Sequence, residues 1–248
     1  MPITIRRSLA AVLSLSLATG LAACGDDDDR EAATPAEVCD AAVDLGAAFG
    51  AVPEDPAEMG AFAAETLVPV SDAFVEGYGD DGPEAEAAAT LSDAFAAMAD
   101  SGDPSAFEDP DVAEAQSVIG ADVHDGCPLE AIDVTAVEYA FQGVPEELTA
   151  GRTSFALTNA GVEDHEMVLF RLNDGVDMTL DDLLDAGEEA FADLTFTGVA
   201  FGGPDTTAYT VVDLEPGTYF LLCFIPVGGG DDGPPHFMEG MRQTITVT

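Results

Sequence analysis

Two different spacings of apolar residues divide the chain near Cys127. From Thr34 to that cysteine, apolar residues recur every three to four positions, which indicates helices with one buried face. From Ile132 onward, apolar and polar residues alternate with a period of two, which is typical of half-buried strands. The change of period predicts an α + β multidomain protein, with one domain over residues 34–127 and another over residues 131–248.

Helix signals in the first of these domains predict a small bundle. Thr34-Pro35-Ala36-Glu37 has the form of a capping box and opens a helix to about Gly50. Further helices are expected over Pro56–Gly77, with a kink at Pro69, from Pro83 onward and from Asp109-Pro110 onward. The short connections favour an up-down arrangement. We recognise no chemistry in this segment, which leaves a spacer or a partner-binding module as its two interpretations.

The second domain is expected to consist mainly of short strands. They are predicted over Ile132–Phe141, Thr153–Thr158, Met167–Leu172, Thr207–Leu214, Thr218–Ile225 and Thr244–Thr248. One helix opens at Thr179 and continues to about Asp193. Strands of this length, separated by glycine-rich and Pro-Gly turns, predict a Greek-key antiparallel β-sandwich.

The first residues of the chain have the features of an export signal. Arg6 and Arg7 precede an uncharged, mostly apolar run that is too short for a typical membrane span. The run ends in Leu21-Ala22-Ala23-Cys24, which resembles the lipobox of bacterial lipoproteins. The resemblance implies a signal peptide over residues 1–23 and a diacylated Cys24, carrying palmitate-like chains, that anchors the protein in membrane lipid. An ordinary signal peptide with a nearby cysteine is the alternative. Residues 24–33, with four consecutive aspartates, are expected to form an acidic tether.

The charge balance excludes one class of partner. There are 49 acidic residues against six basic ones, all arginines, and the formal net charge is −43. Such a surface repels nucleic acid and has no basic patch for anionic lipid. The acidity either keeps the protein soluble or steers it toward a basic partner or a cation, and its spread along the chain favours the first interpretation.

The four cysteines fall into three roles. Cys24 is the lipidation candidate. Cys39 and Cys127 lie at the two ends of the helical segment, which an up-down bundle brings together, and they are the predicted disulfide pair. Cys223 is left unpaired. An odd thiol in an exported protein needs an explanation, and metal ligation supplies one.

Further soft ligands accompany Cys223 in the strand-rich segment. His165 opens one strand, Cys223 ends another, and His236 and Met241 precede the last one. Two imidazoles and a thiolate form a trigonal set that suits copper in both oxidation states, and a weakly held thioether is the usual axial ligand. Taken singly, each residue is more often a core residue; together, in this order, they predict one copper site. Met238 is a second thioether that competes for the axial position.

Residues 131–248 resemble a cupredoxin, the blue copper domain of plastocyanin and azurin. The resemblance rests on Thr158-Asn159-Ala160-Gly161 before His165, Pro216-Gly217-Thr218-Tyr219 before Cys223, and Gly240-Met241 after His236. It implies a type 1 copper ion held by His165, Cys223 and His236 with Met241 axial. There are two departures from the pattern. Twelve residues separate Cys223 from His236, and Glu166 stands where plastocyanins have an asparagine, which is expected to remove a hydrogen bond beside the metal.

This resemblance implies an electron-transfer protein rather than an enzyme. The lipobox-like sequence at Cys24 implies in addition that it is anchored to the outer face of the cytoplasmic membrane, where it would serve a redox partner protein in the cell envelope. The alternatives are a protein that buffers or delivers copper and a metal-free cupredoxin-like binding module. A hydrolase is not expected, because His124 is the only histidine outside the copper set and is predicted to lie on the surface.

Overall fold

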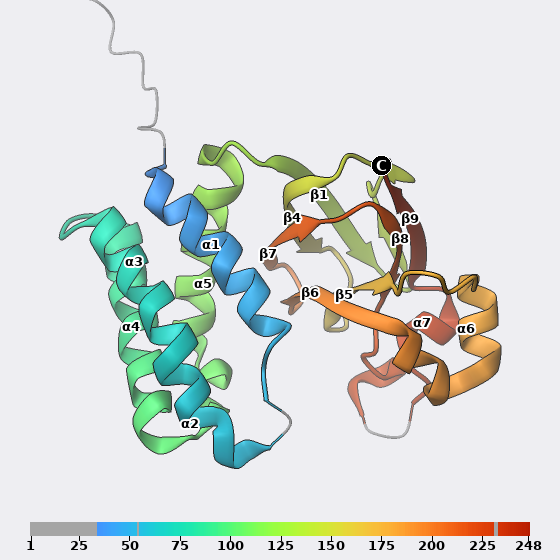
Figure 1. The fold of residues 1–248 in the computed structure, drawn as a ribbon, viewed down its shortest axis with the longest axis horizontal. Coiled ribbons are helices and arrows are strands. Elements are labelled where there is room, and N and C mark those ends of the chain that lie inside the picture. The colour runs from blue at the N-terminus through green and yellow to red at the C-terminus, as the bar shows by residue number, and fades with distance from the viewer. Residues whose placement is uncertain (1–33, 54, 231–232) are drawn as a thin grey trace, which may run out of the picture. The chain divides into compact units, whose positions relative to one another are not determined.

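The computed structural model describes residues 34–53, 55–230 and 233–248, which belong to one compact unit. Within it the protein is α + β, with helices followed by two mixed β-sheets (Figure 1). The predicted signal peptide, the lipidation candidate Cys24 and the acidic tether lie outside the described residues. Over the described part of the chain, every helix is too short or too polar to cross a bilayer.

The first half of this unit is helical, close to the predicted ranges. The elements are α1 (Ala36–Phe49), α2 (Met59–Phe62), α3 (Val68–Tyr78), α4 (Pro83–Ser101) and α5 (Pro110–Gly126), with 3₁₀ turns over Pro56–Glu58 and Pro104–Glu108. A π-helical segment, Ala63–Leu67, joins α2 to α3. It ends two residues before Pro69, which has no N–H to continue the α-helical ladder. The predicted kink at Pro69 therefore takes the form of one wide helical turn.

The predicted capping box at Thr34 is wrong. The residue at the N-cap of α1 is Pro35, and no side chain caps this helix. Instead the Thr34 hydroxyl donates to the carbonyl and the carboxylate of Asp122, near the end of α5. Thr34 thus joins the start of α1 to the end of α5, where Cys39 and Cys127 form the expected disulfide. Because this bond closes a separation of 88 residues, it stabilises the fold by about 4–5 kcal/mol in the chain-entropy treatment.

The second half forms a four-stranded sheet, β2-β1-β4-β7, and a five-stranded sheet, β3-β9-β8-β5-β6. The strands are β1 (Glu130–Val137), β2 (Ala140–Gln142), β3 (Glu147–Leu148), β4 (Gly151–Asn159), β5 (His165–Leu172), β6 (Leu194–Gly202), β7 (Thr207–Leu214), β8 (Gly217–Leu222) and β9 (Arg242–Val247). Two short helices, α6 (Leu180–Ala186) and α7 (His236–Glu239), interrupt them. Apolar side chains from both sheets share one core, which includes Phe155, Leu157, Met167, Tyr219 and Ile245.

The sheets are mixed, whereas the sequence predicted antiparallel pairing only. β1 pairs with β4 in parallel, and β3 pairs with β9 in parallel. Between β1 and β4 the chain crosses to the other sheet to form β3, so β4 returns to the side of β1 in the same direction. A connection through the second sheet takes the place of a hairpin, and parallel pairing follows.

Two strands differ from the predicted ranges. The expected strand Ile132–Phe141 is a hairpin of β1 and β2, which turns at Glu138 and Tyr139 and brings these residues close to the ligand cluster described below. β6 was not predicted. A register shift between Leu169 and Phe170 leaves Thr197 of β6 unpaired, so apolar alternation changes phase within this strand.

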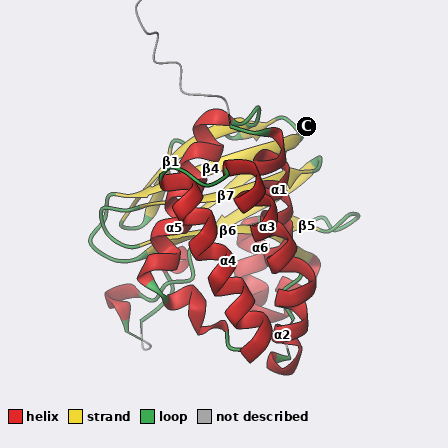
Figure 2. Ribbon diagram, turned by 90° about the vertical axis from the view of Figure 1, so that its left-hand side faces the viewer, coloured by secondary structure: helices red, strands yellow, loops and turns green. Residues whose placement is uncertain are grey.

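The helices pack on the four-stranded sheet through β7 (Figures 1 and 2). Val211 of β7 belongs to the helical core. Gly46 of α1 and Gly120 of α5 make this approach possible. A Cβ at Gly46 would lie 1.8 Å from the carbonyl oxygen of Val211, and one at Gly120 would lie 2.6 Å from Tyr209. Two helical glycines therefore set the distance between the layers.

His124 was predicted to lie on the surface, and this is wrong. It is buried where α5 meets the strands, with Nδ1 2.9 Å from the Ser154 hydroxyl and Nε2 3.4 Å from the Asp133 carboxylate. The structure thus assembles a Ser, His and Asp that the sequence did not bring together. Ser154 is fully buried, so its hydroxyl cannot meet a substrate. The group instead links α5 to β1 and β4.

Candidate metal centre

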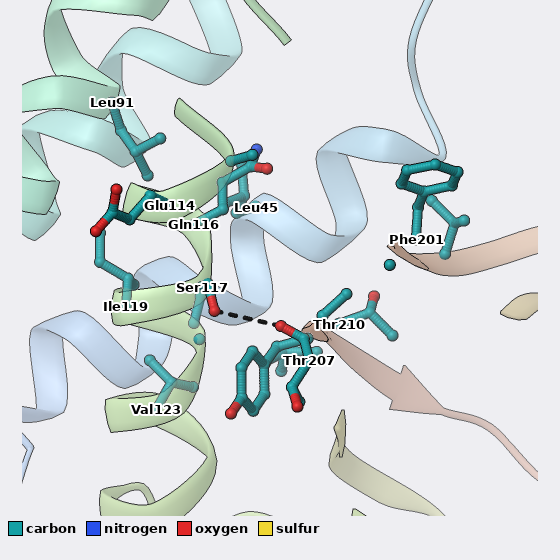
Figure 3. A pocket seen from close by; sticks show the side chains of 18 of the residues that line it. Leu45, Leu91, Glu114, Gln116, Ser117, Ile119, Val123, Phe201, Thr207 and Thr210 are labelled. Carbon is teal, nitrogen blue, oxygen red and sulfur yellow. Dashed lines mark hydrogen bonds between the residues drawn. The ribbon is translucent and has the colours of Figure 1, made fainter. Parts of the chain in front are cut away.

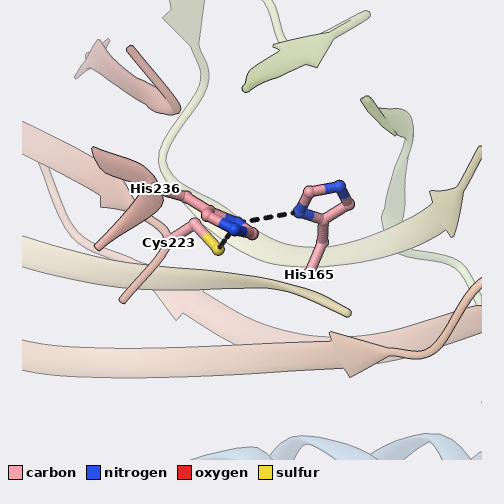
Figure 4. A group of neighbouring side chains, drawn as sticks. All are labelled: His165, Cys223 and His236. Atoms are coloured by element: carbon pink, nitrogen blue, oxygen red, sulfur yellow. Dashed lines mark hydrogen bonds between the residues drawn. The ribbon is translucent and has the colours of Figure 1, made fainter. Parts of the chain in front are cut away.

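Three predicted ligands meet at one end of the two sheets. His165 is the first residue of β5, Cys223 directly follows β8, and His236 is the first residue of α7. All three side chains are fully buried, and their ligand atoms lie within 4.8 Å of one another (Figure 4). Residues separated by up to 71 positions therefore form one compact nitrogen–sulfur cluster.

The long segment between Cys223 and His236 is closed at its base. The N–H of His236 donates to the carbonyl of Ile225, and that of Phe237 donates to the carbonyl of Cys223. An isolated bridge between Pro226 and Pro235 closes the next step outward. The extra residues between Cys223 and His236 therefore form a loop beyond these backbone contacts. Cys223 and His236 stay side by side despite the twelve residues between them.

Met241 is the better placed of the two thioethers. It is fully buried, its N–H donates to the carbonyl of His236, and its carbonyl accepts from the N–H of Cys223. Met238 is 55% exposed. An axial ligand must face a buried cluster, so burial and backbone bonding favour Met241.

The inward-facing atoms are the two Nδ1 atoms and the Cys223 sulfur. The Nδ1 atoms of His165 and His236 lie 3.2 Å apart, and Sγ lies 3.4 Å from Nδ1 of His236. Nitrogen lone pairs converging at this distance need a shared proton or a cation between them. Two imidazoles, a thiol and a buried thioether are the donors that suit copper, so the residues present fit this ion.

Glu163 holds the outer nitrogen of His236. Its Oε2 lies 3.1 Å from Nε2 of His236 and accepts the N–H of Gly228 at 2.7 Å. The Gly228 N–H is the main cause of the lowered pKa of Glu163, and His236 contributes further. The carboxylate is therefore ionised and accepts a hydrogen bond from the imidazole N–H. This fixes the tautomer of His236 with the Nδ1 lone pair turned inward. The ring of Tyr139 covers the same imidazole, with centroids 4.8 Å apart.

Glu138 has a similar place beside His165. Its Oε1 lies 3.6 Å from Nε2 of His165 and accepts the N–H groups of Val162 and Glu163. The Val162 N–H is the main cause of the lowered pKa of Glu138, while burial lowers the pKa of His165 and keeps that imidazole neutral. Sequence reasoning missed both carboxylates, because their roles depend on how two separate turns fold over the cluster.

Glu166 makes hydrogen bonds beside the cluster, although replacement of the asparagine found in plastocyanins was expected to remove one. Its backbone N–H donates to Sγ of Cys223 at 3.5 Å, and its carboxylate accepts the N–H of Phe224 at 2.9 Å. Burial raises the pKa of Glu166. The expected loss of a hydrogen bond is therefore wrong: Glu166 ties β5 to the residue after Cys223.

The thiol of Cys223 is held in its neutral form in the metal-free protein. Burial raises its pKa to about 11, against the lowering effect of the backbone N–H groups of Glu166 and Ile225. A metal that binds here must displace this proton, because the thiolate is the ligand form.

Comparisons with known proteins give only distant likenesses. No protein-family model and no curated protein matches the chain. Auracyanin B is 20% identical over 47% of this chain and 87% of its own, with a TM-score of 0.32. Reduced auracyanin from Roseiflexus castenholzii is 18% identical over 47% of this chain and 95% of its own, with a TM-score of 0.33. Auracyanin A of Chloroflexus aurantiacus is described as a "blue" copper protein. It is 18% identical over 47% of this chain and 97% of its own, with a TM-score of 0.30.

Proposed function

We propose that this protein is a one-electron carrier with a single type 1 copper ion held by His165, Cys223 and His236. The observation that carries the proposal is the fully buried cluster, whose two inward nitrogens and sulfur lie within 4.8 Å of one another. When bound, copper supplies the change between two oxidation states. Met241 is proposed as the axial ligand.

The surroundings of the cluster favour electron transfer over substrate chemistry. The ligands are covered by Tyr139 and by two carboxylates, and we infer that a substrate has no path to the metal position. Glu163 holds His236, and Glu166 connects β5 to the backbone beside Cys223. A ligand set fixed in this way changes little when the charge on the ion changes, which keeps the barrier to electron transfer low. We therefore propose that the protein is not an enzyme.

The proposed place of action is the outer face of the cytoplasmic membrane. It rests on the lipobox-like sequence before Cys24, through which an acylated N-terminus would hold the protein on lipid. The acidic residues 24–33 would extend the redox unit from the surface. A partner oxidoreductase in the envelope would exchange electrons with it.

The deciding experiment is a visible absorption and EPR spectrum of the copper-loaded full chain beside its Cys223→Ser variant. We expect an intense thiolate-to-copper band and one copper per chain, both lost or strongly weakened in the variant. Serine has nearly the same size, so the fold should remain. Stoichiometric copper with slow electron self-exchange would favour buffering or delivery of the ion. No band and no bound copper would overturn the proposal and leave a metal-free binding module.

A further inference from the structure

A second site lies between the helices and strands β6 and β7, apart from the proposed copper ligands. The cavity there has a volume of about 860 Å³ (Figure 3). Side chains of α5, among them Ser117 and Ile119, line one side, and Phe201 of β6 with Thr207 and Thr210 of β7 line the other. Ligand sites in proteins commonly measure about 300–1,000 Å³, so this space is large enough for a drug-sized molecule.

The cavity passes from the surface into the helical core. Phe201 on β6 is 54% exposed at the outer end, while Phe74 and Leu91 at the inner end are fully buried. Gly46 and Gly120 belong to the lining themselves, and their contacts with β7 hold α1 and α5 at a set distance. The Ser117 hydroxyl donates to the carbonyl of Thr207 and adds a fixed polar contact within the same junction. The space is thus framed by rigid elements.

The lining selects against anionic ligands. It is mainly apolar, with aromatic rings from Phe49, Phe107, Phe201 and Tyr209 among its residues. Of the described residues that line it, Glu114 alone carries a charge, and no lysine, arginine or histidine is among them. An anion would meet this carboxylate and the acidic protein without a counter-charge. Aromatic rings favour contact with another ring in offset or edge-to-face geometry.

We propose that this cavity binds a neutral, ring-bearing apolar small molecule. The site is independent of the proposed copper centre, although the two lie on neighbouring strands: Gly202 of β6, which lines the cavity, pairs with His165 of β5. Polar groups of the lining, including Gln116 and Thr210, offer hydrogen bonds to a carbonyl or hydroxyl on the ring. The copper proposal can fail without affecting this one, because neither the ligand contacts nor the test involves the metal.

Two dyes with the same ring system test the proposal. N-phenyl-1-naphthylamine is neutral, and 8-anilinonaphthalene-1-sulfonate adds one negative charge. We expect the full chain to bind the neutral dye at one site, with a rise in fluorescence, and to bind the sulfonate at least about tenfold more weakly. Equal binding of both dyes, or no saturable binding of the neutral dye, would overturn the proposal.

Variants assign the bound dye to the cavity. Ala113→Phe fills the space from an exposed position on α5, and Ala96→Phe makes the same change on an exposed position of α4 outside the lining. We expect the first to weaken binding of the neutral dye about tenfold or more and the second to leave it unchanged. Phe201→Ala, at the exposed end, should also weaken it.

A charge reversal gives an independent readout. Glu114→Lys should increase the affinity for the sulfonate dye several-fold while it leaves the neutral dye almost unaffected. Thermal unfolding of each variant establishes that it is folded. Dye binding that survives both Ala113→Phe and Phe201→Ala in folded protein would place the dye elsewhere and contradict the proposal.

Discussion

Oε2 of Glu163 lies 3.1 Å from Nε2 of His236, and the same carboxylate accepts the N–H of Gly228. A surface carboxylate is thereby joined to a fully buried imidazole whose other nitrogen faces Cys223. Its negative charge acts on the metal position through the ligand itself. This relationship makes the electrostatics of the proposed copper centre testable by removal of a single charge.

Glu163→Gln should raise the reduction potential. The neutral amide removes a negative charge that stabilises the more highly charged oxidised ion. We expect the equilibrium constant for one-electron reduction of the copper ion to increase several-fold in the variant. A tenfold increase corresponds to about 60 mV in reduction potential for one electron. Protein-film voltammetry measures this shift. Asp164→Asn is the matched control, because it removes an exposed charge next in sequence. Equal shifts in both variants would show that the contact with His236 has no special role.

Copper affinity should rise with pH between about pH 7 and pH 9. In this window the thiol of Cys223, whose pKa is raised to about 11 by burial, keeps its proton until the metal displaces it. His165 is already neutral there, because burial lowers its pKa. One proton is therefore released for each ion bound, and apparent affinity should increase up to about tenfold per pH unit. Calorimetry in two buffers of different ionisation enthalpy counts the protons. Binding without proton release would contradict a neutral resting thiol.

The meeting of His165, Cys223 and His236 could be predicted from sequence because each stands at the end of an element. His165 begins a strand, Cys223 follows one and His236 opens a short helix, so the three residues lie together at one end of the two sheets. Glu138 and Glu163 gave no such signal. They lie in turns and reach the imidazoles only through tertiary folding.

Other features depend on contacts between segments that local patterns do not contain. Thr34 has the sequence of a cap, yet its hydroxyl bonds to Asp122 across 88 positions. The bulge at Thr197 shifts the alternation of apolar and polar residues within β6. The strand therefore lacks the continuous period of two that predicts a strand. Gly46 and Gly120 look like weak points in helices, and only the position of β7 gives them a function.

Gly120→Ala should destabilise the protein, although alanine is the better helix former. The new Cβ would lie 2.6 Å from Tyr209, and overpacking of this kind costs about 1–3 kcal/mol. A gain of about 0.5–1 kcal/mol in helix propensity offsets part of the loss. Urea unfolding should therefore show a net loss of up to about 2.5 kcal/mol. In a Tyr209→Gly background, which removes the Cβ as well as the ring, the same change should become neutral or stabilising. A loss of equal size in both backgrounds would show that Tyr209 is not the obstacle.

The two methionines near His236 should respond differently to the same substitution. Met241 is fully buried and bonded through its backbone to Cys223 and His236, whereas Met238 is 55% exposed. Leucine keeps the volume of either side chain but removes the thioether. Met241→Leu should therefore alter the EPR parameters of the copper-loaded protein and raise its reduction potential, since a weak axial sulfur donor stabilises the oxidised ion. Met238→Leu should leave both quantities unchanged. If the effects were reversed, the exposed thioether would have to turn inward on binding, and the axial assignment would pass to Met238.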